Sequence, residues 1–132
     1  MSALAILSLV LPFPLAFVIH EAEEVLCQSK WMKEHKDTLL EKFPRCERLI
    51  RHLSSMHTKA FLLAVLEELL IVMAITCYVL VQGTFALQIW SAIFIAFSLH
   101  LIIHMGISLL VRSYTPGLAT AMVLLPFAAY GL

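Results

Sequence analysis

Four apolar segments, each close to the length needed to cross a lipid bilayer, dominate this sequence. They cover residues 3–26, 58–81, 85–111 and 116–132, and the last is short for a span. A helix needs about 20 apolar residues to cross a hydrocarbon core about 30 Å thick. Of the 132 residues, 61% are hydrophobic and 14% are charged, whereas soluble domains are about 25% charged. The sequence therefore predicts an all-α fold, a single integral membrane domain over residues 1–132 with four transmembrane helices.

The first apolar segment is expected to remain in the mature protein. It lacks the basic start and the small-residue cleavage site of a signal peptide. Pro12 and Pro14 are expected to bend this helix ahead of His20, because proline removes a backbone hydrogen bond. Three cysteines without a C-x-x-C pair indicate neither a disulfide framework nor a thiolate metal site.

The stretch between the first two helices is hydrophilic and amphipathic. From about residue 30 to 56 its apolar residues recur at helical spacing with charged residues between them, a pattern typical of helices along a membrane interface. We expect two short helices divided at Phe43-Pro44, since a residue before proline disfavours the α conformation. This segment is either a connector on the membrane surface or a lid over a pocket that faces the cytoplasm.

The basic residues predict the orientation of the chain. Eight of the nine Lys and Arg residues lie between the first two helices, and the ninth, Arg112, lies on the same side of the membrane. The positive-inside rule therefore predicts that residues 27–57 are cytoplasmic and that both termini are outside. The expected partner is the lipid bilayer, and a homo-oligomer could complete the short fourth helix. Nucleic acid is not an expected partner, because aromatic and basic residues do not interleave.

Ionisable side chains lie at three places within or at the ends of the apolar segments. They belong to His20-Glu21-Ala22-Glu23-Glu24, to Glu67-Glu68, and to His100 with His104. Such residues are costly in hydrocarbon and usually face a bundle interior or a cavity. Because helix residues three and four apart share a face, His20, Glu23 and Glu24 are expected to converge, while Glu21 points elsewhere.

Small residues indicate which helix faces are buried. His100 and His104 extend a row of small residues through Ala92 and Ala96, and Glu67 shares a stripe with alanines. Membrane helices approach each other closely at such faces, which favours Glu67 over Glu68 as the inward residue. At about 1.5 Å of rise per residue, all three ionisable groups lie roughly 9–16 Å below the cytoplasmic helix ends. The sequence therefore predicts one site in one membrane layer.

Histidine and glutamate together favour a metal site. Imidazole and carboxylate are ligands of Zn, Fe and Mn, so one or two divalent metal ions are expected as cofactors. Glu23 is expected to act as a general base or to orient a histidine. A hydrogen-bonded contact between helices, without a metal, is the structural alternative. The candidate ligands are His20, Glu24, Glu67, Glu68, His100 and His104.

Two motifs resemble those of a known family. Residues 20–24 form H-x-x-E-E, and Tyr114-Thr115-Pro116-Gly117 forms Y-x-P-G. Over nearly the whole chain the sequence resembles the HXXEE-domain family of small, mainly bacterial membrane proteins, which are suspected enzymes. At the family's N-x-x-x-H motif, His104 matches and His100 replaces asparagine. The resemblance implies a bacterial inner-membrane location, and it implies that Tyr114 reaches the site as a catalytic group.

The favoured function is that of a membrane-embedded metal-dependent enzyme with a site near the cytoplasmic leaflet. A metal-bound water would hydrolyse a lipidic or peptide substrate. Alternatively, two redox metals bridged by carboxylate would oxidise an apolar substrate, as in di-iron bundles. Direct activation of water by glutamate and histidine without a metal is a further alternative, and so is a small proton or cation transporter or a metal-binding membrane protein. Transport needs polar groups through the full membrane depth, whereas these cluster in one half.

Overall fold

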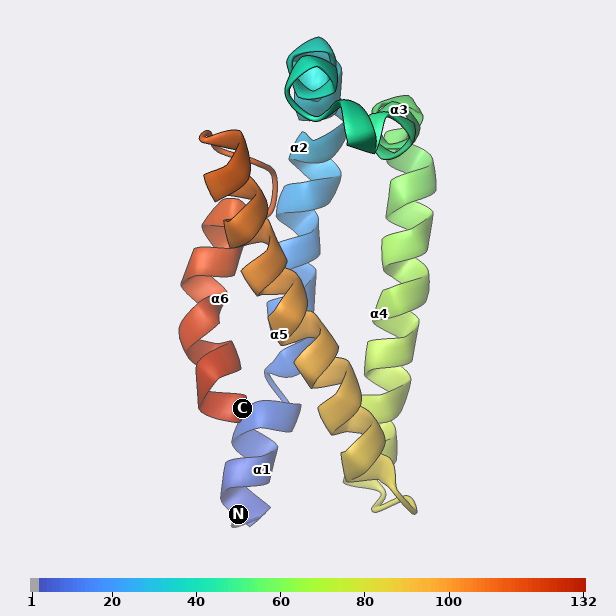
Figure 1. Cartoon of the computed structure of the whole chain (residues 1–132). Coiled ribbons are helices and arrows are strands. Elements are labelled where there is room, and N and C mark those ends of the chain that lie inside the picture. Colours follow the sequence, from blue (N-terminus) through green and yellow to red (C-terminus); the bar gives the residue numbers. More distant parts are fainter. Residues whose placement is uncertain (1–2) are drawn as a thin grey trace.

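The computed structural model describes residues 3–132 of the chain. Its elements, shown in Figure 1, are α1 (Ala3–Val10), α2 (Phe13–Lys42), the 3-10 helix η1 (Pro44–Cys46), α3 (Glu47–Ser55), α4 (Thr58–Leu80), α5 (Ala86–Val111) and α6 (Leu118–Gly131). Helix accounts for 87% of the structure, and no strand occurs among the described residues. The predicted all-α class is confirmed.

Among the described residues, three helical stretches are long and apolar enough to cross a membrane. They are Ala3–Lys42, Thr58–Leu80 and Ala86–Val111. α6 is also apolar but has only 14 residues. At 1.5 Å per residue such a helix reaches about 21 Å, which is less than a bilayer core of about 30 Å. The prediction of a membrane protein is supported by three spans, and a fourth is not confirmed.

α1 and α2 together replace the first span predicted over residues 3–26. The helix is interrupted at Pro12, which cannot donate a backbone hydrogen bond. α2 then continues without a break to Lys42, so the prediction of a separate helix beginning near residue 30 is wrong. The physical reason is that no glycine or proline lies between Pro14 and Phe43 to end the helix.

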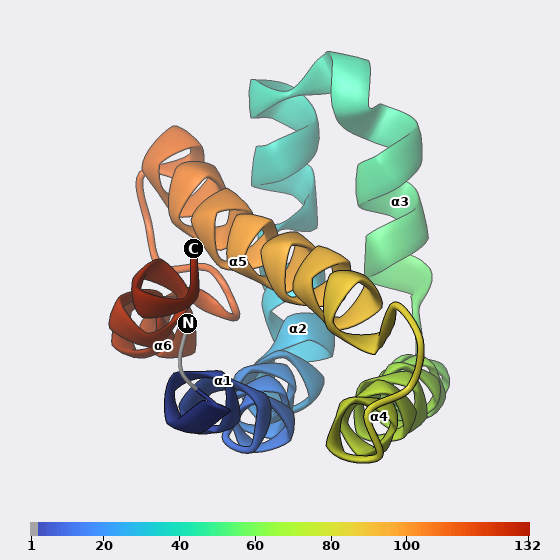
Figure 2. The ribbon, with the colours of Figure 1, turned by 90° about the horizontal axis from the view of Figure 1, so that it is seen from below.

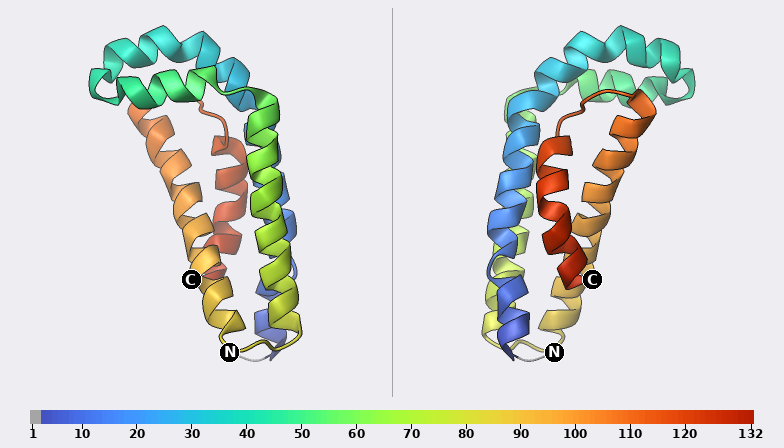
Figure 3. Two further views of the ribbon diagram at one scale, coloured as in Figure 1. Left: turned by 90° about the vertical axis from the view of Figure 1, so that its right-hand side faces the viewer. Right: turned by 90° about the vertical axis from the view of Figure 1, so that its left-hand side faces the viewer.

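The carboxyl-terminal half of α2 and the antiparallel α3 lie side by side across one end of the bundle (Figure 3). We call this unit, residues 27–55, the hairpin. α2 ends at Phe43 as predicted, where a φ of −129° suits a residue before proline. The apolar faces of the two helices meet in a small core of buried Met32, Leu39 and Ile50.

An aromatic core fills the bundle on the other side of the ionisable residues. Phe13 of α2 contacts three rings of α5 edge-on, with ring centroids 5.4–5.6 Å apart, a favourable arrangement for aromatic pairs. The three rings are those of Trp90, Phe94 and Phe97, and all four side chains are at most 6% exposed. His20 packs edge-on against Phe97. The ionisable residues therefore lie between the aromatic core and the hairpin.

α4 is oriented by branched side chains and not by the predicted stripe of small residues. Viewed from the end of the bundle, α5 lies between α6 and α4 (Figure 2). Val72, Ile75 and Thr76 are the buried residues of α4, whereas Glu67 and the alanines of its stripe are exposed. The prediction of the inward face is therefore wrong: the buried face of α4 is displaced around the helix by about one residue position from the predicted face.

The small-residue row predicted on α5 is buried only at its carboxyl-terminal end. His104 and Ser108 are buried, whereas Ala92 and Ala96 are exposed. The loop to α6 covers the buried end, because Ser108 Oγ and Thr115 Oγ1 are hydrogen-bonded at 2.6 Å. The contact between α5 and the start of α6 is therefore polar and specific.

Candidate metal centre

Four side chains from α2 and α5 converge between the aromatic core and the hairpin. They are His20, Glu24, His100 and His104, and one ligand atom of each lies within 4.8 Å of the others. His20 is fully buried, Glu24 and His104 are buried, and His100 is half-buried. Each helix contributes two residues spaced by four, so both side chains point to the same place. The structure thus brings together four of the six ligands predicted from the sequence.

The shortest distances among these donor atoms are those of hydrogen-bonded groups, and they lie close to the spacing of a single metal site. Glu24 Oε1 lies 2.9 Å from His104 Nε2, and Glu24 Oε2 lies 3.7 Å from His100 Nε2. The Nε2 atoms of His100 and His104 are 3.0 Å apart. In a tetrahedral zinc site, bonds of about 2.0–2.2 Å put neighbouring ligand atoms about 3.3–3.6 Å apart. Small movements of these side chains would therefore complete such a site.

His20 gives the most direct sign that a metal ion fits this group. Its Nδ1 lies 2.9 Å from the Thr120 hydroxyl, which itself donates to Glu23 Oε2 at 2.6 Å. Because the hydroxyl proton is already engaged, His20 Nδ1 is the donor to Thr120 and the lone pair is on Nε2. That Nε2 is buried and has no hydrogen-bond partner among the described residues. Buried polar atoms without a partner are rare, and a metal ion would satisfy this one.

Glu23 belongs to a network that orients His20 and does not join the four-residue group. Its Oε2 accepts hydrogen bonds from the Thr120 amide and hydroxyl, and its Oε1 accepts from the Ala119 amide and from Tyr114. The amides belong to the first turn of α6, where a negative charge is stabilised. Loss of solvent and the hydrogen bond to Glu23 raise the pKa of Tyr114, so its hydroxyl remains a donor. Glu23 therefore fixes α6 against α2.

Gly117 lies directly against the ring of His104. Its φ is +87°, a conformation that residues with a side chain rarely adopt. A Cβ at this position would lie 2.6 Å from His104 Nδ1. The loop before α6 therefore requires glycine at position 117 for two reasons. One is the backbone conformation, and the other is the space that the imidazole of His104 occupies.

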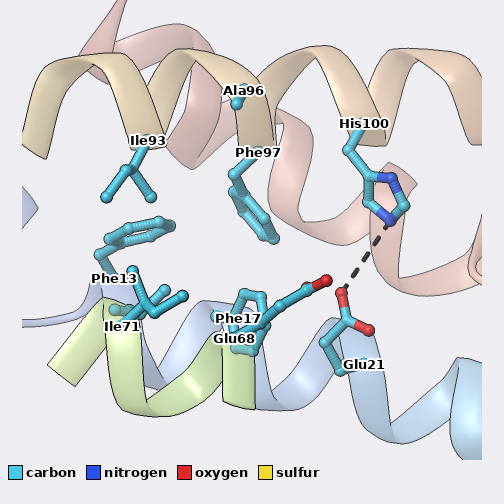
Figure 4. A pocket seen from close by; sticks show the side chains of 10 residues that line it. Phe13, Phe17, Glu21, Glu68, Ile71, Ile93, Ala96, Phe97 and His100 are labelled. Atoms are coloured by element: carbon cyan, nitrogen blue, oxygen red, sulfur yellow. Dashed lines mark ion pairs between the residues drawn. The ribbon is translucent and has the colours of Figure 1, made fainter. Parts of the chain in front are cut away.

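Two further acidic residues lie beside His100 in a cavity of about 330 Å³ between α2, α4 and α5 (Figure 4). They are Glu21, whose Oε1 is 4.0 Å from His100 Nε2, and Glu68. The prediction that Glu21 points away from the site is wrong, because α4 encloses the side of α2 that carries it. The preference for Glu67 over Glu68 is not supported: both residues are exposed on α4, but Glu68 lines this cavity and Glu67 does not.

Comparison with known families adds an independent finding. A family model described as a protein of unknown function with an HXXEE motif matches residues 11–131. The chain belongs to the HXXEE family. The resemblance inferred from the motifs is therefore confirmed. No curated protein and no solved structure matches the chain.

In this HXXEE protein the two motifs form facing walls of one site. H-x-x-E-E supplies His20 and Glu24 to the four-residue group and Glu23 to the network beside it. Y-x-P-G supplies Tyr114, which donates to Glu23 from 91 residues away, and Gly117, which makes room for His104. The residues that define the two motifs therefore contact the site or line a cavity beside it.

Thr120 and Glu21 are the site residues that the sequence analysis did not select. Thr120 links Glu23 to His20, and its one sequence signal is a hydroxyl in the first turn after Y-x-P-G. Glu21 had a signal, since it is an acidic residue within an apolar segment, but helical periodicity alone assigned it to another face.

Thr120→Val is expected to weaken metal binding by about 10–100-fold, as is typical when the partner of a metal-binding histidine is removed. The change keeps the shape of the side chain but leaves His20 Nδ1 without its acceptor. Titration calorimetry with Zn²⁺ measures the effect. The matched control is Thr76→Val, because the buried Thr76 hydroxyl donates to Val72 O within its own helix. Equal effects of the two substitutions would contradict the role given to Thr120.

Proposed function

We propose that this chain is a membrane-embedded metal-dependent hydrolase, whose ligands for one divalent metal ion are His20, Glu24, His100 and His104. The observation that carries this proposal is the buried Nε2 of His20, which has no hydrogen-bond partner among the described residues, on a residue whose ligand atom lies within 4.8 Å of those of Glu24, His100 and His104. In a purely structural contact between helices, such an atom would cost about 1–3 kcal/mol. A bound metal ion removes that cost.

The donor set suits a catalytic metal. Three imidazole nitrogens and one carboxylate oxygen are typical ligands of Zn, Fe or Mn. Because four protein ligands would complete a tetrahedral site, water or substrate would need a fifth coordination position or the place of one of the four ligands. His100 borders the cavity that contains Glu21 and Glu68, so the centre is accessible from that side. This access favours a catalytic role over a purely structural one.

Hydrolysis is the reaction that these groups support best. The metal would supply a Lewis acid and a water made acidic enough to react near neutral pH. The water oxygen bonds to the carbonyl carbon of the substrate, the ester or amide bond breaks, and the leaving group takes the proton. Glu21, 4.0 Å from His100, is our candidate to carry that proton. Glu23 acts instead through Thr120, which makes it a positioning residue.

In this proposal the hairpin lies at the cytoplasmic surface. Eight of the nine Lys and Arg residues lie between positions 30 and 59, and basic loops remain on the cytoplasmic side. The centre is then within the cytoplasmic half of the membrane. α6, with 14 residues, would be a fourth membrane segment that crosses only part of the bilayer.

Metal content tests the proposal. Protein purified without chelator is expected to hold one equivalent of Zn, Fe or Mn per chain by elemental analysis. His20→Ala should lose this metal, because it removes one of four ligands. His35→Ala is the matched control, since the His35 ring stacks on Trp31 in the hairpin and should leave the metal in place. Wild-type protein without metal, or equal loss in both variants, would overturn the proposal.

A carboxylate-bridged dinuclear oxidoreductase is the second candidate, and the positions of Glu21 and Glu68 favour it. Both residues line the cavity on the far side of His100, where they could help to hold a second ion. Two equivalents of iron per chain would favour this function. An iron absorption band that disappears in Glu68→Gln would distinguish it from the hydrolase.

Ion transport has less support. On the side of the centre away from the hairpin, Val10, Phe13 and Phe94 are at most 1% exposed and pack in one apolar core. A transport path needs polar groups through this region. The described side chains offer an apolar barrier there instead.

A further inference from the structure

A second cavity leads from the same centre into the hairpin. Its volume is about 370 Å³, within the range of about 300–1,000 Å³ that is usual for small-molecule sites. Glu24, His100 and His104 line one part of it. The rest is mostly apolar, and its walls from α2, α3 and α5 include Met32, Leu39, Ile50, Leu53, Ile107 and Val111.

This hairpin cavity has the chemistry of a binding site for an amphiphile. Three of the four proposed ligands border it, whereas only His100 borders the cavity that contains Glu21. A polar group at these ligands would lie next to the reacting position, and an attached apolar chain would lie between the hairpin and α5. Burial of such a chain is favourable at about 0.8 kcal/mol per CH₂ group.

The hairpin also explains how such a molecule would be held. Lys42 Nζ donates to the carbonyl oxygen of Val111 at 2.9 Å, which joins the closed end of the hairpin to the end of α5. Residues of both hairpin helices line the cavity, so the hairpin forms one side of it. Its position at the membrane interface suits a molecule that comes from the bilayer with its polar end toward water.

We propose that the hairpin cavity binds the single apolar chain of an amphiphilic substrate, with the polar group that reacts placed at Glu24, His100 and His104. The substrate class is thus a single-chain lipid, such as a long-chain ester or amide. This inference rests on the proposed function for the reaction, but the binding of the chain can be measured without any metal.

Tryptophan fluorescence can detect the chain directly. The protein has two tryptophans, of which Trp31 lines the hairpin cavity and Trp90 lies in the aromatic core. In detergent, the Trp90→Phe protein is titrated with dodecanol that carries bromine atoms in the middle of its chain. The neutral probe avoids repulsion by Glu24. Saturable quenching of Trp31, reversed by unbrominated dodecanol, is the expected result.

Two isoleucines of α5 provide a matched pair of variants in the Trp90→Phe background. Ile107 lines the hairpin cavity, whereas Ile102 does not, and their side chains are 42% and 48% exposed. Ile107→Phe should weaken the binding of the brominated probe about tenfold, because it fills the cavity. Ile102→Phe should leave it unchanged. Equal affinities of the two variants would overturn the proposal.

The outcomes separate this inference from the proposed function. Saturable quenching that persists in the His20→Ala protein supports the chain site, whether or not wild-type protein holds a metal. Stoichiometric metal without saturable quenching of Trp31 overturns the chain site and leaves the metal centre intact. A Trp31→Phe protein keeps Trp90 as its single tryptophan. Saturable quenching in that protein, without quenching in the Trp90→Phe protein, would also overturn the chain site, because the chain would then lie near the aromatic core.

Discussion

Gly117→Ala is expected to destabilise the protein by about 2–5 kcal/mol and to disturb the proposed metal centre. A left-handed conformation costs a residue with a side chain about 1–2 kcal/mol, and φ at this position is +87°. The new methyl group would lie 2.6 Å from His104 Nδ1, and overpacking typically costs about 1–3 kcal/mol. Thermal unfolding in detergent measures the loss, and Zn²⁺ titration measures the accompanying fall in affinity.

Gly106→Ala is the control for this substitution. Gly106 lies within α5, and a Cβ at that position would meet no atom within 4 Å apart from its chain neighbours and the backbone of its own helix. Alanine there should leave the stability unchanged or raise it by about 0.5–1 kcal/mol, because glycine is unfavourable within a helix. If both glycine variants unfolded at the same temperature, the contact between Gly117 and His104 would have no energetic importance.

Glu24→Gln is expected to lower metal affinity more than 100-fold, beyond the range of about 10–100-fold found for residues that only orient a ligand. The amide has nearly the same size, but it removes the single negative charge among the four proposed ligands. It also puts an amide group 2.9 Å from His104 Nε2, where a carboxylate oxygen now lies. Competition with a chelating dye of known Zn²⁺ affinity measures the loss.

Neighbouring glutamates give this prediction its controls. Glu67→Gln should leave metal affinity unchanged, because Glu67 is exposed on α4. Glu23→Gln should have an intermediate effect, since Glu23 reaches His20 through Thr120. If Glu23→Gln abolished binding as completely as Glu24→Gln, the roles assigned to these two residues would be wrong.

The helical class and much of the centre could be predicted from the sequence because they depend on local periodicity. Apolar length identifies the helices, and a spacing of four residues fixes which side chains share a face. His20 with Glu24, and His100 with His104, are therefore grouped correctly within each helix. The break at Phe43 follows from the adjacent proline, which restricts the backbone of the preceding residue.

Helix ends without such a signal were harder to predict. The sequence changes from apolar to charged near residue 27, but α2 continues to Lys42. The hydropathy of a segment indicates whether its helix lies in an apolar or a polar environment. It does not indicate where the helix ends. α2 ends only at Phe43, directly before Pro44, which has no backbone N–H to donate.

Contacts between helices decided the rest of the site. Periodicity alone does not decide which of the adjacent residues Glu67 and Glu68 faces the site. The packing of α4 through Val72 and Ile75 places Glu68 beside the cavity. Packing likewise brings Glu21 within 4.0 Å of His100.

The sequence by itself therefore determined a helical protein of the HXXEE family, with helices apolar enough to span a membrane, and the residues that each helix could contribute to a site. Only the tertiary structure decided that Thr120 sets the proton of His20 and that Gly117 leaves room for His104. The physical reason is that tautomers and close contacts depend on atoms from another helix, whose position no local pattern specifies.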